Sequence, residues 1–117
     1  MIFAFLDDQT LEIVKDVKEA NGEYEGVDVE GGAYRFFNEN GVYLEPKFIV
    51  PNRKGKFLWL FSWAASGAYD LIPNPDYKKY TFAQALKETL FFEPNKYFKD
   101  MNELKEFLCS RDIKVDE

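Results

Sequence analysis

The fold is constrained most by a series of apolar segments with a two-residue period, separated by turn signals, between residues 23 and 72. Val27 and Val29 alternate with Asp28 and Glu30, as they would in a strand with one apolar and one acidic face. Pairs rich in glycine or asparagine separate these segments, which is typical of tight turns. The sequence therefore predicts consecutive antiparallel strands over residues 23–30, 33–37, 42–50, 57–63 and 68–72.

Residues 57–63 differ from the other segments because they contain no charged residue, and Ser62 is their only polar one. A strand that is apolar on both faces is normally covered on both, so this segment is predicted to be the central strand. Pro46 indicates an edge or a bulge in the segment 42–50. Residues 51–55, which include Arg53 and Lys54, are predicted to form a basic turn.

Helical patterns flank the strands. Leu11, Val14 and Val17 recur every three residues, which predicts a helix over residues 9–20. Two further helices are predicted after residue 80, because two pairs have the spacing of a capping box. These pairs are Thr81 with Gln84, and Asp100 with Glu103.

Two shorter segments complete the predicted fold. Residues 2–6 are predicted to be a buried strand or the lead-in to a helix, and residues 113–115 a short last strand. The order of the elements predicts an α+β fold: an antiparallel meander sheet of about five strands, with an N-terminal helix and two C-terminal helices. The length of 117 residues predicts a single domain over residues 1–117.

Composition excludes several kinds of chemistry. The chain has no histidine, and its one cysteine, Cys109, allows neither an intramolecular disulfide nor a cysteine metal site. Without histidine, Ser62, Ser66 and Ser110 lack the usual base for nucleophilic catalysis. No cofactor is expected. The apolar start, residues 1–6, is too short for a signal peptide, and no run approaches a membrane span, so we expect a cytoplasmic protein with no membrane or nucleic-acid partner.

The charge is unevenly distributed along the chain. The first 46 residues hold eleven acidic and three basic residues, and the remaining 71 hold ten acidic and twelve basic residues. Tyrosines are interleaved with the acids, and such a combination suits an interface with a basic protein partner. We expect this partner-binding surface to include Glu23, Tyr24, Glu25, Asp28, Glu30, Tyr34, Glu39, Tyr43 and Glu45.

Two enzymatic alternatives come from the same acids. Asp28 followed by Glu45-Pro46-Lys47 is similar to the core of the PD-(D/E)xK nucleases, which implies that the two acids would hold Mg²⁺ while Lys47 helps to activate water. The match lacks a proline before the Asp, because Val27 stands there, and it has a proline inside the Glu-x-Lys step. A glycosidase with two catalytic carboxylates is the other alternative, although no single pair stands out.

In size, acidity and the interleaving of tyrosine with carboxylate, the chain resembles the small acidic immunity proteins with which bacteria neutralise toxins. This resemblance is one of class and covers no sequence motif. It implies a protein that performs no chemistry and occludes the active site of a basic, nuclease-type toxin. Its carboxylates would stand in for nucleic-acid phosphates. A structural or regulatory subunit of a larger assembly is the remaining alternative.

Overall fold

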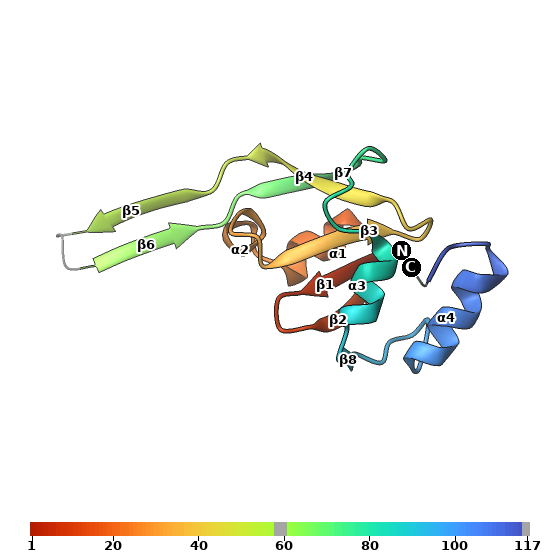
Figure 1. Ribbon diagram of the computed structural model, residues 1–117. Coiled ribbons are helices and arrows are strands. Elements are labelled where there is room, and N and C mark those ends of the chain that lie inside the picture. Colours follow the sequence, from red (N-terminus) through yellow and green to blue (C-terminus); the bar gives the residue numbers. More distant parts are fainter. Residues whose placement is uncertain (58–60, 116–117) are drawn as a thin grey trace.

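The computed structural model describes residues 1–57 and 61–115, with side chains described outside residues 55–64. Six strands form a mixed, mostly antiparallel sheet in the order β7-β4-β3-β1-β2-β8, and two further strands form a separate two-stranded sheet (Figure 1). In chain order the elements are β1 (Ile2–Leu6), β2 (Thr10–Val14), α1 (Val17–Glu23), α2 (Gly26–Glu30), β3 (Tyr34–Asn38), β4 (Tyr43–Val50), β5 (Arg53–Phe57), β6 (Phe61–Ala65), β7 (Ala68–Pro73), α3 (Phe82–Glu88), β8 (Phe91–Phe92) and α4 (Met101–Ser110).

Helices cover both faces of the six-stranded sheet, so two apolar clusters form, one on each side. Successive residues of β1 alternate between them because strand side chains point to opposite faces in turn. Phe3 and Phe5 pack with α3 and α4, whereas Ile2 and Ala4 pack with α1 and α2. We call these sides the α3/α4 face and the α1/α2 face. The predicted α+β class is therefore confirmed, with helices on both faces of a larger sheet.

The predicted helix over residues 9–20 is wrong. Residues 10–14 form β2, which pairs antiparallel with β1, and α1 begins only at Val17. Leu11 and Ile13, two residues apart, both belong to the cluster of the α3/α4 face. Pairing with β1 buries them more fully than a helix with a narrow stripe would, so tertiary contacts override the three-residue spacing. Asp16 caps α1 by accepting a hydrogen bond from the Glu19 amide at 2.9 Å.

The predicted strand over residues 23–30 is also wrong, because residues 26–30 form the short helix α2. Val29 is buried against the α1/α2 face and Val27 is half-buried. The alternation of valine and acid therefore reflects a single helical turn. Gly26 begins this helix where the backbone approaches another segment closely: a Cβ atom there would lie 2.6 Å from Asn52 Oδ1.

The predicted strands over residues 33–37, 42–50 and 68–72 are confirmed as β3, β4 and β7. Pro46 lies beyond the part of β4 that pairs with β3, which ends at Leu44, and a register shift follows between Phe48 and Val50. Both observations agree with the edge or bulge that this proline indicates.

Residues 57–63 were predicted to form the central strand of the sheet. This prediction is wrong for residue 57 and residues 61–63, and residues 58–60 lie outside the described residues. β6 pairs with β5 in the separate two-stranded sheet, which extends away from the rest of the molecule (Figure 1). We call β5 and β6 the arm. The predicted basic turn over 51–55 is wrong from Arg53 onward, because β5 begins there.

The base of the arm is fastened to α2 by one side chain. The Asn52 amide nitrogen donates to the Gly26 carbonyl oxygen at 2.9 Å, and Asn52 Oδ1 accepts from the Gly67 amide at 2.7 Å. Gly67 lies so close to residues 50 and 51 that a Cβ atom would overlap the Val50 carbonyl oxygen. The two strands that enter and leave the arm are thus held against each other and against α2.

The two C-terminal helices are confirmed together with their caps. The Thr81 hydroxyl accepts from the Gln84 amide at 3.1 Å, and Asp100 Oδ1 accepts from the Glu103 amide at 2.9 Å. The predicted strand over 113–115 is wrong. Ile113 donates its amide to the Leu108 carbonyl at 3.0 Å, which closes the end of α4. None of the described helices has the length and apolar character that crossing a membrane requires.

The two glycine environments predict opposite effects of the same substitution. Gly67→Ala should lower the free energy of unfolding by about 3 kcal/mol or more, because its Cβ has no space beside the Val50 carbonyl. Gly22→Ala is the control: nothing lies within 4 Å of its Cβ position in α1, so stability should stay unchanged or rise by up to about 1 kcal/mol. Urea unfolding of both variants measures the difference. Equal stabilities would contradict the close approach at Gly67.

Candidate functional site

The nine residues predicted to bind a partner do not form one surface. Six of them, from Glu23 to Tyr34, belong to α1, α2, the turns beside them and the start of β3. Tyr43 and Glu45 lie on β4 and alternate with Leu44, which packs on the α1/α2 face, so they point to the α3/α4 face. Glu39 lies in the turn between β3 and β4. The sheet therefore separates the predicted site into parts.

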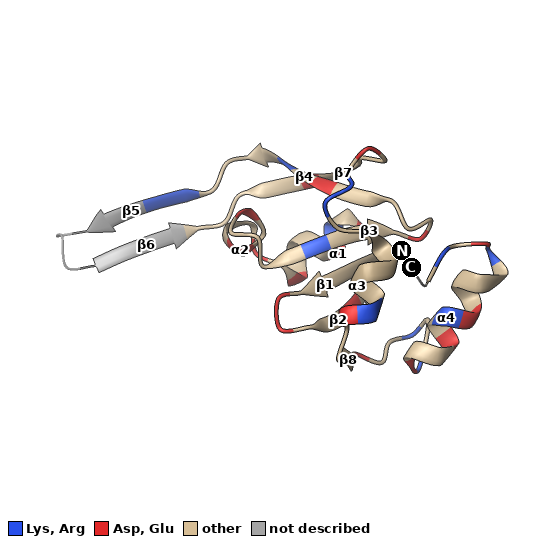
Figure 2. Ribbon diagram, in the orientation of Figure 1, with Lys and Arg blue, Asp and Glu red and all other residues tan. Residues whose placement is uncertain are grey.

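The largest part centres on Tyr34, which is half-buried at the start of β3. Burial raises the pKa of its phenol, and the carboxylates of four acids raise it further. These acids come from the turn after β1, from β2, from the residue before α2 and from α2 itself: Asp7, Glu12, Glu25 and Asp28. We call Tyr34 and these four acids the Tyr34 acidic surface. Figure 2 shows acidic positions at the β1–β2 turn and on α2.

Tyr24 supports this surface from below, because only 3% of it is exposed. Its ring centroid lies 4.7 Å from that of Tyr34, and its hydroxyl donates to Glu12 Oε1 at 2.8 Å. Burial, followed by Glu12, raises the pKa of Tyr24 well above its ordinary value. Tyr24 therefore orients Glu12 and braces Tyr34, and it offers almost no area to a partner. Glu23, Glu25 and Glu30 are exposed around it.

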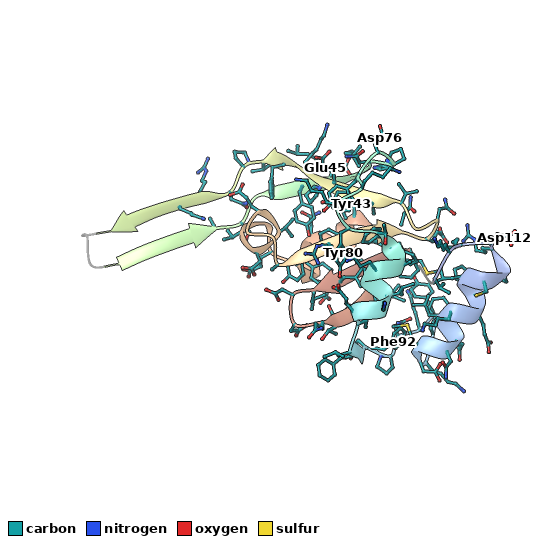
Figure 3. All side chains as sticks on the ribbon, in the orientation of Figure 1. Tyr43, Glu45, Asp76, Tyr80, Phe92 and Asp112 are labelled. Atoms are coloured by element: carbon teal, nitrogen blue, oxygen red, sulfur yellow. The ribbon has the colours of Figure 1, made fainter. Side chains whose placement is uncertain are left out.

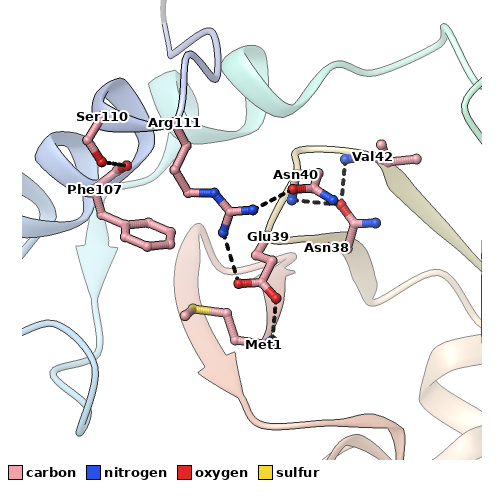
Figure 4. A network of polar contacts seen from close by, with 8 residues as sticks. All are labelled: Met1, Asn38, Glu39, Asn40, Val42, Phe107, Ser110 and Arg111. Carbon is pink, nitrogen blue, oxygen red and sulfur yellow. Dashed lines mark hydrogen bonds and ion pairs between the residues drawn. The ribbon is translucent and has the colours of Figure 1, made fainter.

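Glu39 is engaged within the chain. Its carboxylate lies 3.6 Å from the amino group of Met1 and 3.1 Å from Arg111 Nη1 (Figure 4). Arg111 also donates to Asn40 Oδ1 at 2.7 Å. These contacts join the β3–β4 turn to the start of β1 and the end of α4, so the charge of Glu39 is already paired.

On the α3/α4 face, Tyr43 is stacked on Tyr77, with ring centroids 3.7 Å apart and an angle of 14° between the rings. The guanidinium carbon of Arg35 lies 4.0 Å from the centroid of the Tyr80 ring. Figure 3 shows Tyr43 and Tyr80 together with the exposed Glu45 on this side of the molecule. Burial raises the pKa of Tyr43, and Arg35 opposes this effect. Sequence reasoning did not single out Arg35, although it is the one charged residue within the apolar strand β3.

The nuclease-like set is not assembled. Asp28 lies on α2, which packs on the α1/α2 face, whereas Glu45 and Lys47 point to the α3/α4 face of β4. Lys47 is opposite Asp70 in the neighbouring strand. Within residues 1–57 and 61–115, no group of three acidic or cysteine side chains is arranged to hold a metal ion. The geometry thus separates the residues that this chemistry needs close together.

A pocket that the sequence did not reveal lies at the end of the sheet near the β1–β2 turn. It has a volume of about 200 Å³, and the residues that line it include Asp7, Gln9, Arg35, Tyr80 and Glu88. These residues come from the turn, from β3 and from the α3 region, so only the three-dimensional structure brings them together.

Comparison of the chain with protein-family models, with curated proteins and with solved structures found no significant match in any of the three.

The tyrosine environments predict an unusual alkaline titration. Tyr24, Tyr34, Tyr43, Tyr69 and Tyr80 all have raised pKa values, about 12 for Tyr69 and for Tyr80. Absorbance at 295 nm should show these five phenols ionising above pH 10 in the folded protein, and near pH 10 in concentrated urea. Because the folded pKa values are raised, the stability that these tyrosines contribute is complete below about pH 10 and is lost as pH rises through their folded pKa values, which are about 12 for Tyr69 and Tyr80. A folded-state titration centred at pH 10 for all tyrosines would contradict this assignment.

Proposed function

We propose that the protein is a non-enzymatic binding protein whose Tyr34 acidic surface receives a basic protein partner. The partner class that fits best is a nuclease-type toxin domain, so the protein would act as an immunity protein. In this proposal Glu23 and Glu30, exposed beside the surface, belong to its rim. Tyr43 and Glu45 lie on the other face, and the paired Glu39 contributes little.

One observation carries the proposal: four carboxylates from separate segments lie near enough to a half-exposed tyrosine to raise its pKa, and this tyrosine rests on a buried one. Such an arrangement supplies a rigid aromatic contact surrounded by negative charge. Tyrosine contributes large contact area at a low cost in conformational entropy. Convergent carboxylates attract a basic protein and speed its association.

The mechanism needs no bond to be made or broken. A nuclease binds phosphates through lysine and arginine side chains in its substrate groove. Glu25 and Asp28, both exposed, would occupy the positions of those phosphates, while Tyr34 would fill space between them. Occlusion of the groove then inhibits the enzyme. The exposed carboxylates of Glu25 and Asp28, and their position near Tyr34, support this mechanism.

The first test is the salt dependence of association. The probes are a panel of purified basic ribonucleases and any basic toxin domain that the neighbouring gene is found to encode. Glu25→Gln with Asp28→Asn should slow association by about tenfold at low ionic strength and by much less at high ionic strength, because salt screens the attraction. Glu93→Gln with Glu106→Gln removes two exposed charges elsewhere and is the control.

Surface plasmon resonance at two salt concentrations measures both double variants. An unchanged association rate for the first, or equal slowing in both, would remove the Tyr34 acidic surface as the interface. If no basic protein of the panel binds and the neighbouring gene encodes no toxin, the immunity assignment is overturned. A structural or regulatory subunit then becomes the better hypothesis.

The second test addresses the aromatic contact. Tyr34→Ala should raise the dissociation rate by about 30-fold, as expected when a central interface tyrosine is truncated. Tyr97→Ala removes a half-buried tyrosine from the region before α4 and should leave dissociation unchanged. Circular dichroism verifies that both variants fold. Equal dissociation rates for the variant and the wild-type protein would show that Tyr34 is not an anchor.

A further inference from the structure

The pocket near the β1–β2 turn has features of a binding site that the proposed function does not use. Its walls come from the β1–β2 turn, the start of β3 and the α3 region, and its floor includes Phe5 and Ala85. A volume of about 200 Å³ is smaller than the roughly 300–1,000 Å³ of sites for drug-sized ligands. The occupant must therefore be small.

Arg35 supplies positive charge to the pocket. The Arg35 guanidinium carbon lies 4.0 Å from the centroid of the Tyr80 ring, and the Tyr80 hydroxyl donates to the Glu88 carboxylate. The ring thus provides a fixed support against which the guanidinium stacks. Among the described residues the ion pairs involve Met1, Glu39 and Arg111, and Arg35 has none. Its donors are available to a ligand, and they match the two oxygens of a carboxylate.

Two acids, Asp7 and Glu88, also line the pocket. The Asp7 amide donates to the Ala33 carbonyl at 2.9 Å, which fixes the turn beside β3. Glu88 accepts one hydrogen bond from Tyr80. A carboxylate accepts several hydrogen bonds, so Glu88 retains acceptor capacity for a ligand.

The turn that carries Asp7 is held in an uncommon backbone conformation. Gln9 has a φ of 70°, in the left-handed region that residues other than glycine rarely adopt. Two contacts with the segment at the end of α3 maintain it: the Gln9 side chain donates to the Glu88 carbonyl at 3.1 Å, and the Gln9 carbonyl accepts from the Leu90 amide at 2.9 Å. The turn and the end of α3 therefore form one rigid rim around the pocket.

We propose that this pocket binds a small zwitterion of the amino-acid class, with its carboxylate on Arg35 and its ammonium group between Asp7 and Glu88. The pocket presents both signs of charge within a space that accommodates a molecule of this size. A phosphate would face two carboxylates, and a simple cation would face the guanidinium. A zwitterion satisfies all three groups at once.

The site is separate from the one proposed to bind a protein partner. Arg35 follows Tyr34 directly on β3, so the two side chains point to opposite faces of the sheet. Asp7 is common to both sites because its turn lies at the end of the sheet. Arg35 and Tyr80 belong to the pocket alone, which allows the two proposals to be tested independently.

The test is a titration of the full chain with each of the standard amino acids at millimolar concentration, followed by ¹H–¹⁵N NMR. Binding should shift the Arg35 Nε–H signal and the amides of Gly32, Ala33 and Thr89, which surround the pocket. For the amino acid that shifts these signals most, analogues lacking either the amine or the carboxylate should bind about tenfold more weakly, the loss expected for a charge-assisted contact.

Variants then test the assigned residues. Arg35→Gln should weaken binding by about tenfold or more. Arg53→Gln, which removes an exposed cation from the arm, should leave it unchanged. If Arg35→Gln fails to fold, Asp7→Asn replaces it. This variant should bind the amino acid more weakly, and its binding of the analogue without the amine should not weaken.

Three results would overturn the proposal: no amino acid shifts the pocket signals, the amine-free analogue binds equally well, or Arg35→Gln binds like the wild-type protein. Failure of the protein-binding proposal leaves these measurements unaffected, because they involve no partner protein.

Discussion

The burial of β1 on both of its faces is the constraint on which the rest of the structure depends. Phe3 and Phe5 anchor α3 and α4 on one side, and Ile2 and Ala4 contact the cluster beneath α1 and α2 on the other. The neighbouring strands β2 and β3 pair with β1 in register and inherit the same alternation. Adjacent residues therefore serve opposite faces, which is why Tyr34 and Arg35 belong to two different sites although they are joined by one peptide bond.

Elements set by local sequence signals were predicted correctly more often than elements set by pairing with a distant strand. The caps at Thr81 and Asp100 and the strands β3, β4 and β7 followed from turn residues, capping pairs and apolar alternation, all of which act within a few residues. The prediction of a helix over residues 9–20 failed because pairing with β1 decides the conformation of residues 10–14. The prediction for residues 23–30 failed because a five-residue helix is too short for its period to be distinguished from alternation. Of the two valines, only Val29 is buried against the sheet.

The structure brings together only part of the residues that were predicted to form the site. Interleaved tyrosines and acids do come together, yet only around Tyr34. Glu12 lay within the helix predicted over residues 9–20 and Asp7 just before it, so neither acid was expected there. Glu39 is paired with Met1 and Arg111, which come from opposite ends of the described chain. Sequence spacing carries no information about such pairings, because they depend on segments far apart in the chain. Arg35 could not be singled out from the sequence for the same reason, because its position in the pocket depends on its contact with Tyr80, which is bonded to Glu88.

The arm is basic, whereas the rest of the molecule is acidic, so the charge is unevenly distributed in space. Residues 51–69 contain Arg53, Lys54 and Lys56 and no acid, which gives them a charge of +3 (Figure 2). Since the net charge of the chain is −6, the other residues together carry −9. A basic partner would be attracted to the body of the molecule and repelled by the arm. Asn52 fastens the base of the arm to α2, the helix that carries Asp28, and thereby fixes the two charged regions relative to each other at this joint. Charges held in a fixed arrangement orient an approaching protein before contact, whereas the same charges on independent segments would only attract it. In the proposed function, this joint at Asn52 and Gly67 would favour the approach of a basic partner to the acidic surface from one side.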